Sequence, residues 1–141
     1  MLRIFIKKQR TTTCSFSMIL IHGLWDVLTC FNHLLEWICP EAHGREPAAK
    51  FKDGTRTQRF YYRLWNSTDY KNIKDLCNNL KHFHHKASGP DISIEKGAKA
   101  GLLRAGDSLS QTYFLSDHED VRVILMAVYR EYKGYFDGAF K

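Results

Sequence analysis

Apolar residues recur at steps of three and four along several stretches of the chain, and this spacing is typical of amphipathic helices. The first such stretch runs from Phe16 to Cys39, and Pro40 then ends the helix. Its apolar face is formed by Leu24, Leu28, Phe31, Leu35 and Ile38. At about 100° per residue, the opposite face carries His22, Asp26, Thr29, His33 and Glu36.

Two further helices are predicted in the middle of the chain. The loop over residues 41–55 leads into "RTQRFYYRLW", which offers Phe60, Tyr61, Leu64 and Trp65 to the core. Ser67 or Thr68 then caps the next helix. One side of that helix carries Ile73, Leu76, Leu80 and Phe83. The other side carries Lys74, Asn78, Lys81, His82 and His85.

The last third of the chain changes its pattern. Between Asp91 and Leu115, short alternating runs separated by glycine predict two or three small strands. Ser116 and Glu119 have the spacing of a capping box for a last helix. Its apolar positions are Val121, Ile124 or Leu125, Val128, Tyr132, and Tyr135 or Phe136. The fold class predicted is mainly α, a bundle of three or four helices with a small β insertion before the last helix.

The length suits one domain, and the positive charge suits a polyanionic partner, although a modest positive charge is also ordinary for a soluble protein. A chain of 141 residues, 44% of them hydrophobic, suits a single domain over residues 1–141, with residues 1–15 as a basic arm or short strand. The net charge is +6, and the segment from Arg45 to Arg63 is rich in basic residues. The residues predicted to contact phosphates are Lys50, Lys52, Arg56 and Arg59.

The aromatic residues have two explanations, because they can stack on bases or pack in the core. Most have aliphatic neighbours at helical spacing, which favours the core. The residues concerned are Trp25, Trp37, Tyr61, Tyr62, Trp65 and Tyr113.

The four cysteines show no C-x-x-C pair, so we expect a reduced, cytoplasmic protein. The apolar run from Met18 to Ile21 is too short for a signal peptide, and no uncharged window is long enough to span a membrane. Cys77 lies at the edge of an apolar face, where we expect it to pack rather than to act as a nucleophile.

The histidines of "HFHH" raise two kinds of chemistry. A metal site would combine His82 and His85 with His22 or His33 and Asp26, but no ligand motif accompanies them, and we predict neither metal nor cofactor.

RNA cleavage without a metal needs a histidine to move a proton and a cation to hold the phosphate. His82 is the best acid or base, Lys81 and Lys74 are the cations, and His85 supports them. Asp26 or Glu36 would orient His82 if the two polar faces met. A solvated polar face explains the same residues without any chemistry.

Three segments resemble the HEPN superfamily of small, all-α prokaryotic proteins: "LWDVLTCFNHLLEW", "DLCNNLKHFHH" and "VILMAVYREYKGYF". This resemblance spans about residues 19–136. It implies a homodimer and, in active members, metal-independent RNA cleavage by an arginine, a following polar residue and a histidine. Asn78 matches the polar residue and His82 the histidine, while Cys77 stands in the place of the arginine.

That replacement weakens the case for catalysis, because a neutral thiol cannot hold a phosphate as a guanidinium does. We therefore expect a non-catalytic or weakened RNA-binding or regulatory protein, in a phage-defence or toxin–antitoxin setting with a cognate antitoxin or defence partner. One alternative is a metal-independent endoribonuclease that uses His82, Asn78 and Lys81. The other is a protein-interaction module that has no nucleic-acid role.

Overall fold

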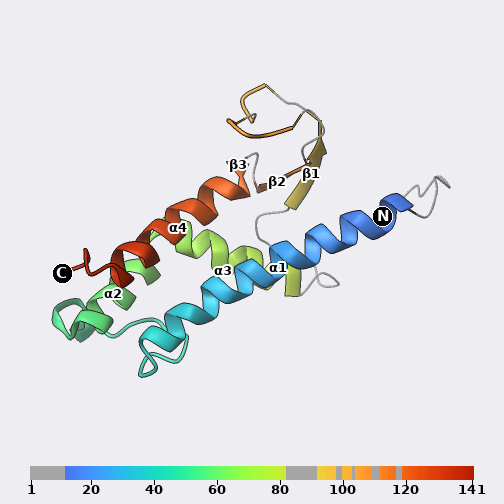
Figure 1. The fold of residues 1–141 in the computed structure, drawn as a ribbon. Helices are drawn as coiled ribbons and strands as arrows, with labels where there is room; N and C mark the ends of the chain where they lie inside the picture. Colours follow the sequence, from blue (N-terminus) through green and yellow to red (C-terminus); the bar gives the residue numbers. More distant parts are fainter. Residues whose placement is uncertain (1–11, 82–91, 98–99, 103, 109–111, 117–118) are drawn as a thin grey trace.

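The described part of the chain contains four α-helices and a small antiparallel sheet (Figure 1). The computed structural model describes residues 12–81, 92–97, 100–102, 104–108, 112–116 and 119–141. The helices are α1 (Thr12–Ile38), α2 (Arg56–Trp65), α3 (Thr68–Lys81) and α4 (Val121–Phe136), and a 3₁₀ turn, η1 (Ala49–Asp53), precedes α2. The strands are β1 (Ile92–Lys96), β2 (Thr112–Ser116) and β3 (Glu119–Asp120). The prediction of a mainly α fold with a small β insertion before the last helix is confirmed.

Helix boundaries follow local signals in most places. Ser67 accepts a hydrogen bond at its hydroxyl from the Tyr70 amide at 3.2 Å, which confirms it as the cap of α3. Thr55 and Gln58 form a capping box at the start of α2. α1 ends at Ile38, before Pro40 as predicted, but begins at Thr12, so residues 12–15 are helical and do not belong to an arm. Residues 1–11 lie outside the described part of the chain.

The start of α4 differs from its prediction. Ser116 is the last residue of β2 and pairs with Ile92 on one side and Glu119 on the other, so the predicted capping box of Ser116 and Glu119 is wrong. The cap is Asp120, whose Oδ1 accepts a hydrogen bond from the Arg122 amide at 2.9 Å. The pairing of β2 with β3 places Asp120 directly before α4. The capping-box spacing considers only residues around one helix end and therefore cannot predict an effect of strand pairing.

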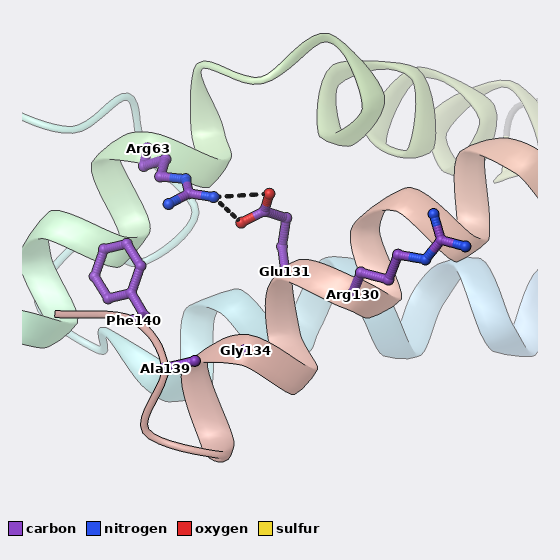
Figure 2. A pocket seen from close by; sticks show the side chains of 6 residues that line it. All are labelled: Arg63, Arg130, Glu131, Gly134, Ala139 and Phe140. Carbon is purple, nitrogen blue, oxygen red and sulfur yellow. Dashed lines mark hydrogen bonds and ion pairs between the residues drawn. The ribbon is translucent and has the colours of Figure 1, made fainter.

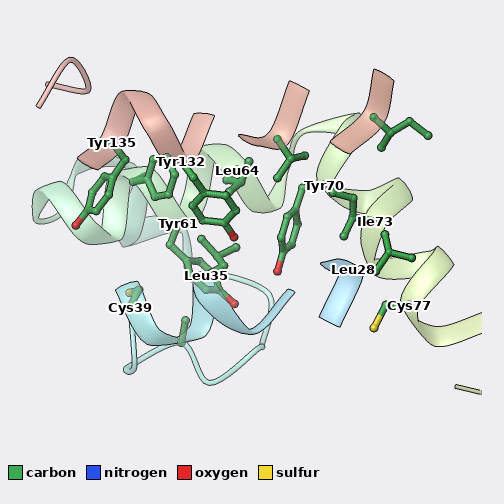
Figure 3. Close-up of a cluster of buried hydrophobic side chains, with 14 of the residues drawn as sticks. Leu28, Leu35, Cys39, Tyr61, Leu64, Tyr70, Ile73, Cys77, Tyr132 and Tyr135 are labelled. Carbon is green, nitrogen blue, oxygen red and sulfur yellow. The ribbon is translucent and has the colours of Figure 1, made fainter. Parts of the chain in front are cut away.

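The core lies where α1 and α4 pack against α3 and α2 (Figure 3). Among the predicted core positions, the fully buried ones include Leu28, Leu35, Phe60, Tyr61, Ile73, Leu76, Ile124 and Val128. The core prediction for Trp37 is wrong, because its side chain is 77% exposed, and Trp25 is also exposed. Each tryptophan lies one position outside the apolar stripe of α1.

Three buried tyrosines bind main-chain carbonyls of α1 or the loop that follows it. The hydroxyl of Tyr132 donates to the Phe31 carbonyl at 2.7 Å, that of Tyr70 to the Asn32 carbonyl at 3.1 Å, and that of Tyr61 to the Arg45 carbonyl at 2.8 Å. Burial raises the pKa of all three phenols. They therefore remain protonated donors.

An ion-pair network attaches the segment before β2 to the start of α4. Arg122 donates to Asp107 at 2.6 Å and to Asp120 at 2.7 Å, and its guanidinium lies 5.1 Å from the centre of the Tyr113 ring. The two carboxylate side chains are 8% and 3% exposed, so the network is largely closed to water. The hydrogen bonds from Arg122 lower the pKa of Asp107. Arg122 thus favours the charged form of Asp107.

Candidate nucleic-acid interface

The polar face of α3 ends at the edge of the described chain. Asn78 is exposed, and Lys81 is described only as the last residue of α3. His82 and His85 lie outside the described residues. The predicted grouping of these side chains around a phosphate therefore stays a prediction.

Cys77, in the place that the resemblance gives to an arginine, faces the bundle. Its side chain is 7% exposed, and Sγ lies 3.7 Å from the Thr29 hydroxyl of α1. α3 therefore carries a packed thiol where the family pattern requires a phosphate-binding cation.

Lys74 is directed toward α2. Its ammonium lies 3.9 Å from the centre of the Trp65 ring, in cation–π geometry, and Trp65 stacks on Tyr61 at 5.5 Å. A substrate phosphate would have to compete with this contact. Lys74 is thus a weaker substitute for the missing arginine than the sequence indicates.

The acidic and histidine side chains of α1 are exposed or half-buried. Asp26 is exposed, and Nδ1 of His33 lies 3.1 Å from Oε2 of Glu36 in the next turn of the same helix. The hypothesis that Asp26 or Glu36 orients His82 falls on a residue outside the described part of the chain.

Lys50 and Lys52 are presented to solvent by a turn that is fixed to the core. Phe51 between them is only 6% exposed, and its ring meets Tyr61 edge to face at 6.3 Å. Both lysine side chains are exposed, and neither ammonium makes an ion pair with another described residue. These two cations remain available for a ligand.

The two arginines predicted to bind phosphates already bind the chain itself. Arg59 donates from Nη1 to the Gly54 carbonyl at 2.9 Å, which places its guanidinium at the end of η1. Arg56 donates to the carbonyls of Phe140 and Tyr135, and its guanidinium lies 4.5 Å from the centre of the Tyr135 ring. Arg59 keeps donors free beside the lysines, whereas Arg56 is used to hold the C-terminal segment. We call Lys50, Lys52 and Arg59 the basic edge.

A hollow of about 200 Å³ lies between α2 and the end of α4 (Figure 2). Its charged side chains are Arg63, Arg130 and Glu131, and Arg63 donates to both carboxylate oxygens of Glu131 at 2.6 and 2.8 Å. The carboxylate both neutralises this arginine and repels an anion, so the hollow is a poor phosphate site. None of the predicted site residues lines it.

The cysteines differ strongly in access, and this predicts their reactivity. Cys39 is fully buried and donates to Glu41 at 3.2 Å, and burial together with that carboxylate raises its pKa to about 11. At pH 8 about one Cys39 thiol in a thousand would be ionised. Cys30 is exposed on the single chain. We expect iodoacetamide to modify Cys39 only after denaturation, as read by peptide mass spectrometry. Modification of Cys39 in the folded protein as fast as in the denatured one would contradict its packing.

The prediction from sequence missed a second apolar row on α1. It consists of Gly23, Val27, Cys30, Leu34 and Trp37, and we call it the outer row. Each member lies one residue before a member of the apolar face of α1, which we call the core stripe (Leu24, Leu28, Phe31, Leu35 and Ile38). The outer row therefore repeats the 4-3-4-3 spacing of the core stripe. All of its members but the half-buried Leu34 are exposed.

Within the described residues, no three histidine, cysteine, aspartate or glutamate side chains lie close enough together to hold a metal ion. No described helix is long and apolar enough to cross a bilayer.

The chain matches no family model, no curated protein and no solved structure.

Proposed function

We propose that the protein binds RNA through the basic edge without cleaving it, as a non-catalytic relative of the HEPN proteins. The support is the arrangement of η1: Phe51 is fixed in the core, so Lys50 and Lys52 on either side of it project into water. Arg59 adds a guanidinium at the end of the same turn. Asp53 is the only acid in η1, so the turn carries a net positive charge.

Such an edge suits a phosphate backbone better than a small ligand. Lysine binds phosphate as a point charge, and a turn that is already ordered loses little entropy when a ligand binds. Each phosphate that is neutralised releases counterions, so several exposed cations give salt-dependent affinity without sequence preference.

Two contacts support binding without catalysis. The Cys77 thiol is packed against Thr29, and the Lys74 ammonium lies over Trp65. Neither residue offers a free cation to the transition state of phosphoryl transfer, where such groups contribute most.

Replacing Lys50 and Lys52 with glutamine is expected to weaken binding of single-stranded RNA about tenfold near 0.1 M salt and to reduce the slope of log K against log salt by about 1.4. The reason is the loss of two phosphate contacts from a turn whose anchor, Phe51, is unchanged. Fluorescence anisotropy with a labelled oligonucleotide at several salt concentrations measures both quantities.

The matched control is Lys71→Gln with Lys96→Gln, which removes the same charge from exposed positions on α3 and β1. Equal losses in the two double variants would indicate only non-specific attraction to a basic protein. Incubation of wild-type protein with total RNA in EDTA should leave the RNA intact. Cleavage that disappears in His82→Ala would instead support the endoribonuclease, and absence of RNA binding at low salt would favour a protein-interaction role.

A further inference from the structure

The outer row gives α1 a second seam of coiled-coil type on its solvent side. Its 4-3-4-3 spacing places these five side chains on one strip of the helix, about 100° around from the core stripe. Trp37 is 77% exposed and Val27 is 42% exposed, while Gly23 has no atom within 4 Å of the point where a Cβ would lie. A glycine inside a helix costs about 1 kcal/mol relative to alanine, so an open glycine in an apolar row favours a close neighbour there.

α4 extends this surface. The rings of Phe31 and Tyr132 stack at 5.7 Å where α1 and α4 meet. Tyr129 and Phe136 lie three residues before and four residues after Tyr132, and so occupy the same strip of α4. They are 47% and 61% exposed. Val27 and Leu34 lie four residues before and three residues after Phe31 on α1, so the two exposed strips border the same helix contact.

We propose that this surface binds a second copy of the chain, with the two α1 helices antiparallel across a two-fold axis between Val27 and Cys30. In this register Gly23 faces Leu34 of the partner subunit, and Val27 faces Cys30 of the partner subunit. Both of these layers pair a larger side chain with a smaller one, as interdigitated packing requires. A symmetric contact of this kind needs one surface that complements itself.

The charges beside the row fit the same arrangement. Asp26 and His33 border it on the side away from α4, seven residues apart. Antiparallel pairing brings each Asp26 to within about 3 Å, along the helix axis, of His33 of the partner subunit. Within the single chain, Asp26 makes no ion pair with another described residue. A parallel arrangement of the two helices would instead place each Asp26 beside Asp26 of the partner subunit, where the charges repel.

The apolar area is of the right order for such a contact. At 77%, 47% and 61% exposure, Trp37, Tyr129 and Phe136 together leave roughly 300–450 Å² of side chain in water. A stable interface buries about 800 Å² on each partner, so these three rings supply about half of it. The surface lies away from the side of α1 that Cys77 contacts, so it does not involve the α3 face that the HEPN resemblance would pair. It is also independent of the basic edge.

The experiment compares Val27→Glu with Val123→Glu by sedimentation at micromolar concentration. Both valines are exposed on helices, at 42% and 37%, so both variants should fold, as circular dichroism will show. We expect a dimer for the wild type and for Val123→Glu. Val27→Glu should weaken the dimer at least about 100-fold, because the symmetric contact would bury the new charge twice.

A thiol cross-link tests the register. The two Cys30 residues should lie about 4.5 Å apart along the helix axis, so a short bismaleimide should join two chains of wild-type protein and none of Cys30→Ser. A monomer in sedimentation, or a dimer that Val27→Glu leaves intact, would overturn the proposal. A dimer without the Cys30 cross-link would overturn the antiparallel register. RNA or lipid vesicles that bind a monomeric wild type through Val27 would assign the outer row to a different ligand.

Discussion

Replacing Phe60 with alanine is expected to lower the free energy of unfolding by about 3–5 kcal/mol. Phe60 is fully buried and lies among three other rings: those of Tyr135 at 4.4 Å, Phe140 at 5.3 Å and Tyr132 at 5.8 Å. The variant loses the transfer free energy of the ring and leaves a cavity where α2, α4 and the C-terminal segment meet. Urea unfolding followed by circular dichroism measures the change.

Val123→Ala is the control, because it truncates an apolar side chain of α4 that is 37% exposed and lies outside the proposed dimer surface. We expect a loss within about 1 kcal/mol. Similar losses in the two variants would mean that Phe60 does not lie at the centre of the core.

Replacing Arg122 with methionine is the second change expected to be strongly destabilising. It leaves Asp107 and Asp120 close together, with side chains 8% and 3% exposed, and removes the guanidinium that donates to both. Asp107 keeps the Arg104 amide at 3.0 Å and Asp120 keeps Arg104 Nε at 3.8 Å, but both carboxylates lose their closest charged donor while they stay shielded from water. Most of their desolvation cost is then uncompensated. We expect lower stability in urea and faster hydrogen exchange of the β2 amides, because Arg122 connects the segment before β2 to α4.

Lys133→Met is the control within the same helix. Both side chains of the Lys133–Asp137 pair are exposed, so water screens the pair and it should contribute little to stability. A loss from Arg122→Met no larger than that from Lys133→Met would contradict the network.

Acid provides a second measurement of the Arg122 network. The pKa of Asp107 is lowered from the ordinary value of 3.8, so its contribution to stability is complete above that pH and disappears as the pH falls through the lower folded value. This part of the acid dependence should be absent in Asp107→Asn.

The apolar periodicity predicted most of the fold because burial acts on whole helix faces. Leu28, Leu35, Ile73 and Val128 fall where the stripes place them. Trp37 is exposed instead. A tryptophan side chain is apolar enough to favour the core, but this one lies one residue away from the apolar stripe and so points to solvent. The start of α4 was missed for a related reason, since Asp120 reaches the helix end through strand pairing.

The candidate site was less predictable, because charge in a sequence carries no information about existing partners. Lys50 and Lys52 are exposed as expected. Arg56, only four residues after Lys52, binds the carbonyls of Tyr135 and Phe140, which are 79 and 84 residues away along the chain. Lys74 likewise meets Trp65 across the turn that joins α2 to α3. Contacts of this kind arise from the tertiary fold and leave no periodic signal.

The tyrosine hydroxyls also limit how the first helix can shift. Two packed apolar helices can often shift by one residue along their axes at a small cost in free energy, because one apolar contact replaces another. Here, sliding α1 along its axis would break the bonds of Tyr70 to Asn32 and of Tyr132 to Phe31 at once, and each stranded hydroxyl would cost about 1–3 kcal/mol. Tyr70 of α3 and Tyr132 of α4 thus fix the position of α1 along its own axis. They thereby also fix the axial position of every side chain on the solvent side of α1.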